Sequence, residues 1–185
     1  MPDMKQITSV TNARAIAILT AIVLAAAMRL VPHPPNFSPV AAMALFSGAH
    51  LARRGLGFVA PLGALFLSDI FIGFHSQMLT VYGSMALIVC LGWLLARRRS
   101  ASSIGLAAVA GSVLFYAITN FGVWAFSDMY PKTLAGLMTC YAAAIPFFQN
   151  SLAGDLFFTA ILFGGFALAE RMMPALRERP TLRAA

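Results

Sequence analysis

The sequence predicts an all-α protein of the polytopic membrane class, folded as a single bundle of helices over residues 1–185. Apolar residues make up 60% of the chain and charged residues only 10%, whereas a soluble domain contains roughly 45–50% and 25%. Mean hydropathy is +0.82. A chain of this composition lacks the polar surface that a soluble enzyme needs, and two cysteines are too few to hold a disulfide scaffold together.

The lengths of the apolar stretches predict six membrane spans. A helix needs about 20 mostly apolar residues to cross roughly 30 Å of hydrocarbon. Six stretches approach that length, and we expect one span in each: 13–31, 38–52, 57–74, 78–96, 103–126 and 151–170. The 38–52 stretch is short, so we expect a tilted or irregular helix there. The apolar segment 134–148 contains Pro146 and is followed by Gln149-Asn150-Ser151, which favours a re-entrant or interfacial piece.

The distribution of basic residues predicts the orientation, because Lys and Arg favour the cytoplasmic side of a membrane. With both termini cytoplasmic, the outer side contains only Arg29 and Lys132. The inner side then contains the other 11 of the 13 basic residues: Lys5, Arg14, Arg53, Arg54, Arg97, Arg98, Arg99, Arg171, Arg177, Arg179 and Arg183. The net charge of +7 therefore reports topology in a lipid bilayer, and we expect no nucleic-acid partner.

The first apolar stretch has two interpretations. Basic residues followed by 16–27 with an Ala25-Ala26-Ala27 ending are typical of a signal peptide, whose removal would leave the orientation unchanged. The spacing of alanines favours a retained helix instead. An unbroken series at every fourth position forms a smooth face on which another helix can approach closely in lipid; its members are Ala13, Ala17, Ala21 and Ala25. That helix belongs either to this bundle or to a partner protein.

Charged residues at membrane depth are costly, and here they gather near the predicted outer end. Arg29, Asp69 and Asp155 are expected at one level, where opposite charges can pair and lower each other's cost of desolvation. One interpretation is a clasp that holds three helices together. The other is that the same residues edge a polar ligand cavity that opens to the outside.

Other polar and aromatic side chains are expected at the same outer end. They are His33, Asn36, His75, Tyr82, Asn120, Tyr141 and Asn150. Ligand sites combine apolar and aromatic walls with a few convergent polar groups, so this inventory predicts an outward-facing pocket. Two outer histidines without a third placed ligand do not predict a metal site. The chain has no P-loop, zinc-protease or nucleophile-elbow motif, and we expect no catalytic residues and no cofactor.

Together these features resemble the S components of energy-coupling factor transporters. The matching stretches are the alanine-rich 13–29, the segment Asn36-Phe37-Ser38-Pro39-Val40-Ala41-Ala42, and 58–73 with its late Asp69. The second half, with 119–124 and 144–150, resembles small bacterial membrane proteins grouped near S components.

The resemblance implies a membrane-embedded, substrate-binding subunit for uptake of a vitamin or related micronutrient in the bacterial inner (cytoplasmic) membrane. Docking on a transmembrane coupling subunit, which acts with ATPases, would fall on Ala17, Ala21 and Ala25. The small-molecule substrate would meet Arg29, His33, Asn36, Asp69, His75, Tyr82, Asn120, Tyr141, Asn150 and Asp155.

Two departures bear on the substrate. Nickel and cobalt S components begin Met-His, whereas this chain begins Met1-Pro2, which disfavours a free metal ion. Solitary cobalamin-binding members present a cysteine to the pocket, and only Cys140 lies on the predicted outer side; cobalamin stays open as a substrate. The competing hypothesis is a membrane enzyme or structural bundle in which Arg29, Asp69 and Asp155 serve packing or proton transfer.

Overall fold

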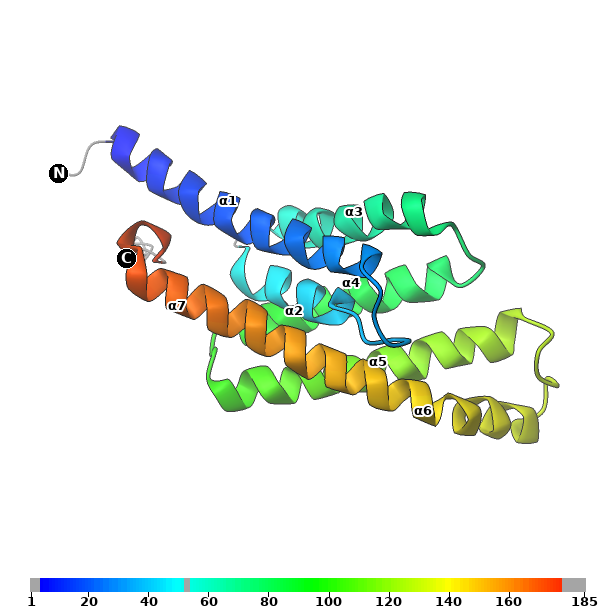
Figure 1. The fold of residues 1–185 in the computed structure, drawn as a ribbon. Coiled ribbons are helices and arrows are strands. Elements are labelled where there is room, and N and C mark those ends of the chain that lie inside the picture. Colours follow the sequence, from blue (N-terminus) through cyan, green and yellow to red (C-terminus); the bar gives the residue numbers. More distant parts are fainter. Residues whose placement is uncertain (1–3, 52–53, 178–185) are drawn as a thin grey trace.

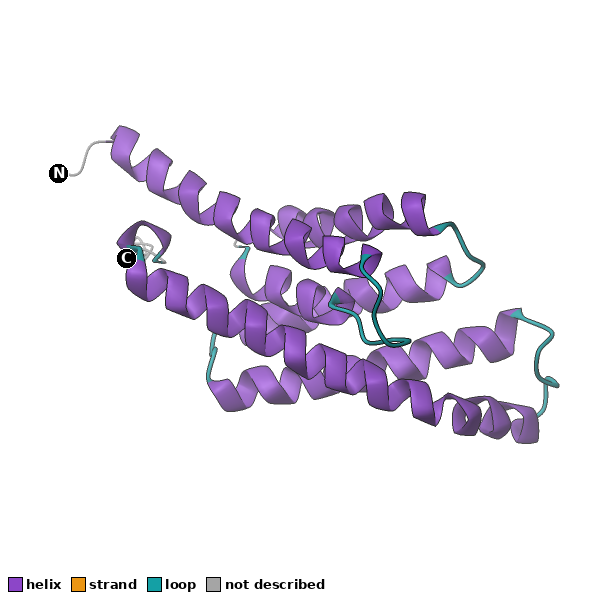
Figure 2. Cartoon of the chain, in the orientation of Figure 1, coloured by secondary structure: helices purple, strands orange, loops and turns teal. Residues whose placement is uncertain are grey.

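The computed structural model describes residues 4–51 and 54–177, which form helices joined by short loops with no strand among them (Figures 1 and 2). The predicted cytoplasmic residues Arg53, Arg179 and Arg183 lie outside the described residues. The α-helices are α1 (Met4–Ala27), α2 (Val40–His50), α3 (Arg54–Ile72), α4 (Met78–Leu95), α5 (Ala101–Phe126), α6 (Leu134–Thr159) and α7 (Gly165–Met172). The 3-10 turn η1 (Met28–Leu30) follows α1, the π-helical turn η2 (Ala160–Gly164) lies between α6 and α7, and the 3-10 turn η3 (Pro174–Leu176) follows α7.

Successive helices run back and forth along the bundle. Both described ends of the chain and the α4–α5 connection therefore lie at one end, and the three other long loops lie at the opposite end (Figure 1). We refer to these as the inner and outer ends, after the sides that the basic residues predict. The α5–α6 hairpin extends furthest at the outer end, and the loop 31–39 between η1 and α2 extends least (Figure 1).

Within the described residues, five helices are long and apolar enough to cross a membrane. These candidate spans are Ala13–Leu30, Gly55–Ile72, Met78–Leu95, Ala101–Phe126 and Leu134–Met172. A multi-pass membrane bundle is therefore confirmed. The first helix begins at Met4, earlier than the predicted 13–31, because it continues through a polar segment beyond its apolar part.

The prediction of a separate re-entrant segment at 134–148 is wrong. This segment and the predicted span 151–170 form one continuous helical run, Leu134–Met172, with Pro146 inside α6. Two of the polar residues after Pro146 bond to backbone carbonyls: the Ser151 hydroxyl donates to the Phe147 oxygen at 3.1 Å, and the Asn150 amide donates to the Pro35 oxygen at 3.1 Å. Membrane helices tolerate an internal proline when neighbouring groups satisfy the freed backbone.

The prediction of a span at 38–52 is also wrong. The helix found there, α2, has 11 residues and is about 16 Å long, roughly half the thickness of the hydrocarbon. Every residue from Val40 to Ala49 is buried. Helix α2 is therefore a core helix enclosed by its neighbours, and the loop 31–39 completes its pass toward the outer end.

Glycines allow α2 and α4 to cross closely. A Cβ atom on Gly48 would lie 2.2 Å from the Val89 carbonyl oxygen, and one on Gly92 would lie 2.4 Å from the Leu45 carbonyl oxygen. Contacts this short leave no room for a side chain on either helix. Without a hydrophobic drive between helices in lipid, such close packing is a principal source of association.

We predict that Gly92→Ala lowers the stability of the bundle by about 1–3 kcal/mol, the usual cost of overpacking. Gly83→Ala on the same helix is the matched control, because a Cβ there meets no atom within 4 Å, and replacing a helical glycine adds about 0.5–1 kcal/mol. Thermal unfolding in detergent measures both. Equal effects of the two substitutions would contradict the close crossing.

Candidate functional site

A buried ion pair joins η1, α3 and α4 near the outer end. Arg29 Nη1 donates to Asp69 Oδ1 at 2.8 Å, and the Tyr82 hydroxyl donates to Asp69 Oδ2 at 2.7 Å. Arg29 also donates to Ser68 Oγ and to the Leu65 carbonyl oxygen. The Asp69 side chain is 1% exposed and that of Arg29 is 15% exposed. Both carboxylate oxygens thus have a donor within the protein.

This arrangement, which we name the clasp (Arg29, Asp69 and Tyr82), fits the structural interpretation of these charges. A buried pair offsets its desolvation cost only when further hydrogen bonds satisfy it, and here they do. The predicted pairing of Arg29 with Asp69 is confirmed. Asp155 does not join them, because its Oδ2 lies 2.6 Å from the Ser112 hydroxyl of α5 and is hydrogen-bonded there.

A cavity of about 220 Å³ lies at the outer end between the loop 31–39, α4, α5 and α6. Two of the predicted site residues, Asn36 and Asn120, line it. The complete lining is Asn36, Val81, Phe115, Tyr116, Thr119, Asn120, Ala144, Phe147, Phe148 and Ser151. Four polar side chains on an aromatic wall give the composition typical of a small-ligand site.

The polar side chains that α5 and α6 contribute to the cavity keep hydrogen-bond acceptors for a ligand. Thr119, Asn120 and Ser151 each donate to a backbone carbonyl one turn earlier in the same helix, at 2.8, 2.8 and 3.1 Å. A hydroxyl oxygen and an amide oxygen retain lone pairs after such a bond. The cavity therefore suits a molecule that carries N–H or O–H donors, and no charged side chain lines it.

Contacts with α6 position the loop that carries Asn36. Asn36 adopts a positive φ of 63°, a left-handed conformation that asparagine accepts more readily than most residues. The Asn150 amide donates to the Pro35 carbonyl oxygen at 3.1 Å. The Phe37 ring packs on two phenylalanines of α6, with centroids 5.7 and 5.6 Å apart. A Cβ on Gly154 would lie 3.0 Å from the backbone nitrogen of Ser38, so a glycine allows the loop to approach this closely.

Two tyrosines hold α5 and α6 together beside the cavity. The Tyr116 hydroxyl donates to the Tyr141 carbonyl oxygen at 2.5 Å, and the Tyr141 hydroxyl donates to the Ala117 carbonyl oxygen at 2.6 Å. Tyr141 thus supports the wall residue Tyr116 without lining the cavity itself. Among the predicted site residues, Tyr141 and Asn150 are therefore supports of the cavity.

The two predicted outer histidines lie apart from the cavity. His33 is exposed beside an apolar groove, with Nδ1 3.0 Å from the Pro34 carbonyl oxygen, and His75 is exposed in the α3–α4 loop. Over the part of the chain that the structure describes, no group of three or more His, Cys, Asp or Glu side chains is placed to hold a metal ion.

The apolar groove has a volume of about 970 Å³ and runs between α1 on one side and α6 and α7 on the other. Ala17, Ala21 and Ala25 all line it. Ala17 and Ala21 are half-buried and Ala25 is buried, so the alanine series also packs against the core. Figure 1 shows α1 and α7 with α2 between them in this view.

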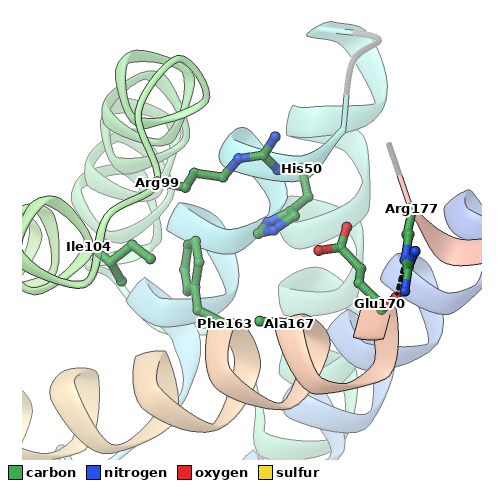
Figure 3. Close-up of a pocket in the computed structure, with 7 residues that line it drawn as sticks. All are labelled: His50, Arg99, Ile104, Phe163, Ala167, Glu170 and Arg177. Carbon is green, nitrogen blue, oxygen red and sulfur yellow. Dashed lines mark hydrogen bonds between the residues drawn. The ribbon is translucent and has the colours of Figure 1, made fainter. Parts of the chain in front are cut away.

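A second cavity, about 230 Å³, lies at the inner end between α2, α5 and α7 (Figure 3). His50, Arg99, Glu170 and Arg177 line it with three apolar residues. The imidazole of His50 stacks against Phe46 and two rings of the α6–α7 run. Burial, with the nearby charge of Arg99 adding to it, lowers the pKa of His50 to about 3, so this side chain is neutral at physiological pH.

Sequence reasoning missed Tyr116, Thr119 and Ser151 as cavity residues. Thr119 directly precedes the predicted Asn120. Ser151 begins a polar series at every fourth position of α6 that continues through Asp155 and Thr159. Residues at this spacing share one face of a helix. This series was therefore the feature of the sequence that could have indicated Ser151 as an inward-facing polar residue.

Comparisons with known proteins place the chain in a family. No curated protein and no solved structure matches it. The family model described as "Family of unknown function (DUF6580)" matches residues 9–176, nearly the whole chain. The chain therefore belongs to DUF6580, a family of unknown function.

Proposed function

We propose that this protein is a membrane-embedded substrate-binding subunit, similar to an S component, that serves the uptake of a vitamin or related micronutrient. The supporting observation is the outer cavity, in which Asn36, Thr119, Asn120 and Ser151 converge on an aromatic wall. The proposal assigns no catalytic chemistry to the chain. Substrate enters from the outer end and leaves toward the inner end after the bundle reorients.

The size and lining of the cavity support a small, uncharged substrate. Its volume of about 220 Å³ is below the usual range of roughly 300–1,000 Å³ for ligand pockets. A single heterocycle with N–H or O–H donors suits this space and the acceptor-rich lining. A corrinoid such as cobalamin is several times larger and is disfavoured by the cavity in this conformation.

The clasp supports the same assignment indirectly. Arg29, Asp69 and Tyr82 are engaged with one another, so these groups hold η1, α3 and α4 together, and none of them lines the cavity. Ligand recognition then falls on neutral side chains. This division agrees with an uncharged substrate, because no charged side chain lines the cavity to balance a charge on the ligand.

The groove between α1 and α7 suits a transmembrane helix of a coupling subunit. Its walls are formed mainly by apolar side chains, and small residues of α1 allow a close approach. On the α1 side it extends from Ala17 to Met28, which corresponds to about 16 Å of helix. We propose that the partner, which acts with ATPases, docks here.

For the binding site, we predict that Thr119→Val weakens the affinity for substrate about tenfold, because a ligand donor loses its acceptor. Thr139→Val is the matched control: Thr139 makes the same bond to a carbonyl one turn earlier, at 2.8 Å, but is exposed outside the cavity. The measurement is the thermal shift of each purified variant across a panel of vitamins and their precursors. Equal affinities of the two variants for substrate would show that the substrate does not bind in the outer cavity.

For the docking face, we predict that Ala17→Leu combined with Ala21→Leu fills the groove and abolishes uptake and copurification of the coupling subunit. Ala110→Leu is the control, because Ala110 is exposed on α5 and lies away from the groove. Thermal unfolding of the purified variants checks that the fold survives. Uptake that is unaffected by the double substitution would refute docking at this face.

A further inference from the structure

Asp155 occupies a closed void at the centre of the bundle. Residues of α2, α4, α5 and α6 enclose it, and the void is too small to hold a water molecule. The Asp155 residue is 5% exposed. Apart from Asp155 and Thr159, the lining consists of alanine, leucine, isoleucine and glycine.

The hydrogen bonds around Asp155 match a neutral carboxylic acid. Ser112 Oγ lies 2.6 Å from Asp155 Oδ2 and 3.1 Å from the Ala108 carbonyl oxygen. A hydroxyl carries one hydrogen, so it cannot donate to both oxygens at once. If Asp155 is protonated, its O–H donates to Ser112 Oγ, and the Ser112 hydroxyl donates to Ala108. Both short contacts are then satisfied.

The residues that line the void offer no positive charge to balance an ionised Asp155. The void's lining from α2, α4, α5 and α6 contains no titratable group other than Asp155 itself. The Arg29 guanidinium is engaged with Asp69 in the clasp. An isolated ionised carboxylate in such a setting carries a large desolvation penalty.

The second polar group that lines this void, the Thr159 hydroxyl, has no hydrogen-bond partner among the residues that the structure describes. The Thr159 hydroxyl is buried and no hydrogen bond to it is found in the structure, although Thr159 is only 4% exposed. Buried polar groups without partners are uncommon and often mark functional positions. Here the unpaired hydroxyl lies one helical turn from Asp155.

We propose that Asp155 is a proton-binding site within the membrane and that it holds a proton in the conformation described here. The reaction is the transfer of one proton from a hydronium ion to the carboxylate of Asp155: one O–H bond forms on Asp155, one O–H bond of the hydronium ion breaks, and a water molecule is released. Water reaches the carboxylate only when the seam between α5 and α6 opens. The outer cavity begins one turn away at Ser151.

The segment of α6 that carries Asp155 has an irregularity of the helix on each side of it. Pro146 lies before it inside α6, and the π-helical turn Ala160–Gly164 follows directly after Thr159. Prolines and π turns are the usual points at which a membrane helix bends. The segment from Pro146 to Thr159 can therefore move relative to α5 while the rest of the helix stays packed.

Infrared spectroscopy of the full chain in lipid vesicles tests the proposal independently of any substrate. A protonated carboxylic acid has a carbonyl band that a carboxylate lacks, and the chain has only six acidic residues. At neutral pH we expect this band in the wild type and its loss in Asp155→Asn. Asp128→Asn is the control, because Asp128 is exposed in the α5–α6 loop, and it should leave the band unchanged.

Ser112→Ala provides a second readout in case Asp155→Asn does not fold. Removing the acceptor of the acid's hydrogen bond should move the carbonyl band to higher frequency and preserve its intensity. A wild type without the band, or a band that Asp155→Asn leaves in place, would overturn the proposal. A band that Ser112→Ala does not move would overturn it as well.

Discussion

A polar group inside a chain surrounded by lipid is costly unless it finds a partner within that chain, and this constraint organises the structure. The clasp satisfies both oxygens of Asp69 with Arg29 and Tyr82. The same requirement explains why α2, which is too short to cross the hydrocarbon, is enclosed by other helices: its unpaired end groups would be costly against lipid. The irregular loop 31–39 is tolerated because it rests on α6.

This constraint divides the polar residues by role. The side chains of the clasp bond to one another and hold the helices together. Three side chains that line the outer cavity keep acceptor lone pairs for a ligand: Thr119, Asn120 and Ser151. The outer cavity, the void at Asp155 and the inner cavity follow one another along the single helical run of α6 and α7. We propose that a substrate recognised at the outer end is released at the inner end through movement along this run, with a partner docked beside α1.

Hydropathy predicted α3, α4 and α5 within a few residues, because each is one apolar run of the length that a bilayer requires. It failed at α2 because a helix buried by protein and a helix surrounded by lipid have the same apolar composition. It failed at 134–148 because the helix continues through Pro146 and the polar residues after it, where Asn150 donates to the loop 31–39 and Ser151 to a carbonyl of the same helix. The depth of the charged residues along their helices predicted the pairing of Arg29 with Asp69. Depth does not fix the direction in which a side chain points, so it could not show that Asp155 points toward α5 and away from this pair. Single hydroxyls such as Thr119 carry no signal in an apolar helix.

Native mass spectrometry of the protein released from membrane vesicles reports whether the outer cavity holds a small molecule. We expect one small, uncharged molecule bound per chain, either copurified or taken up from a vitamin panel. A chain that carried only lipid and detergent, and stayed unliganded after incubation with every member of that panel, would rule out the outer cavity as a substrate site.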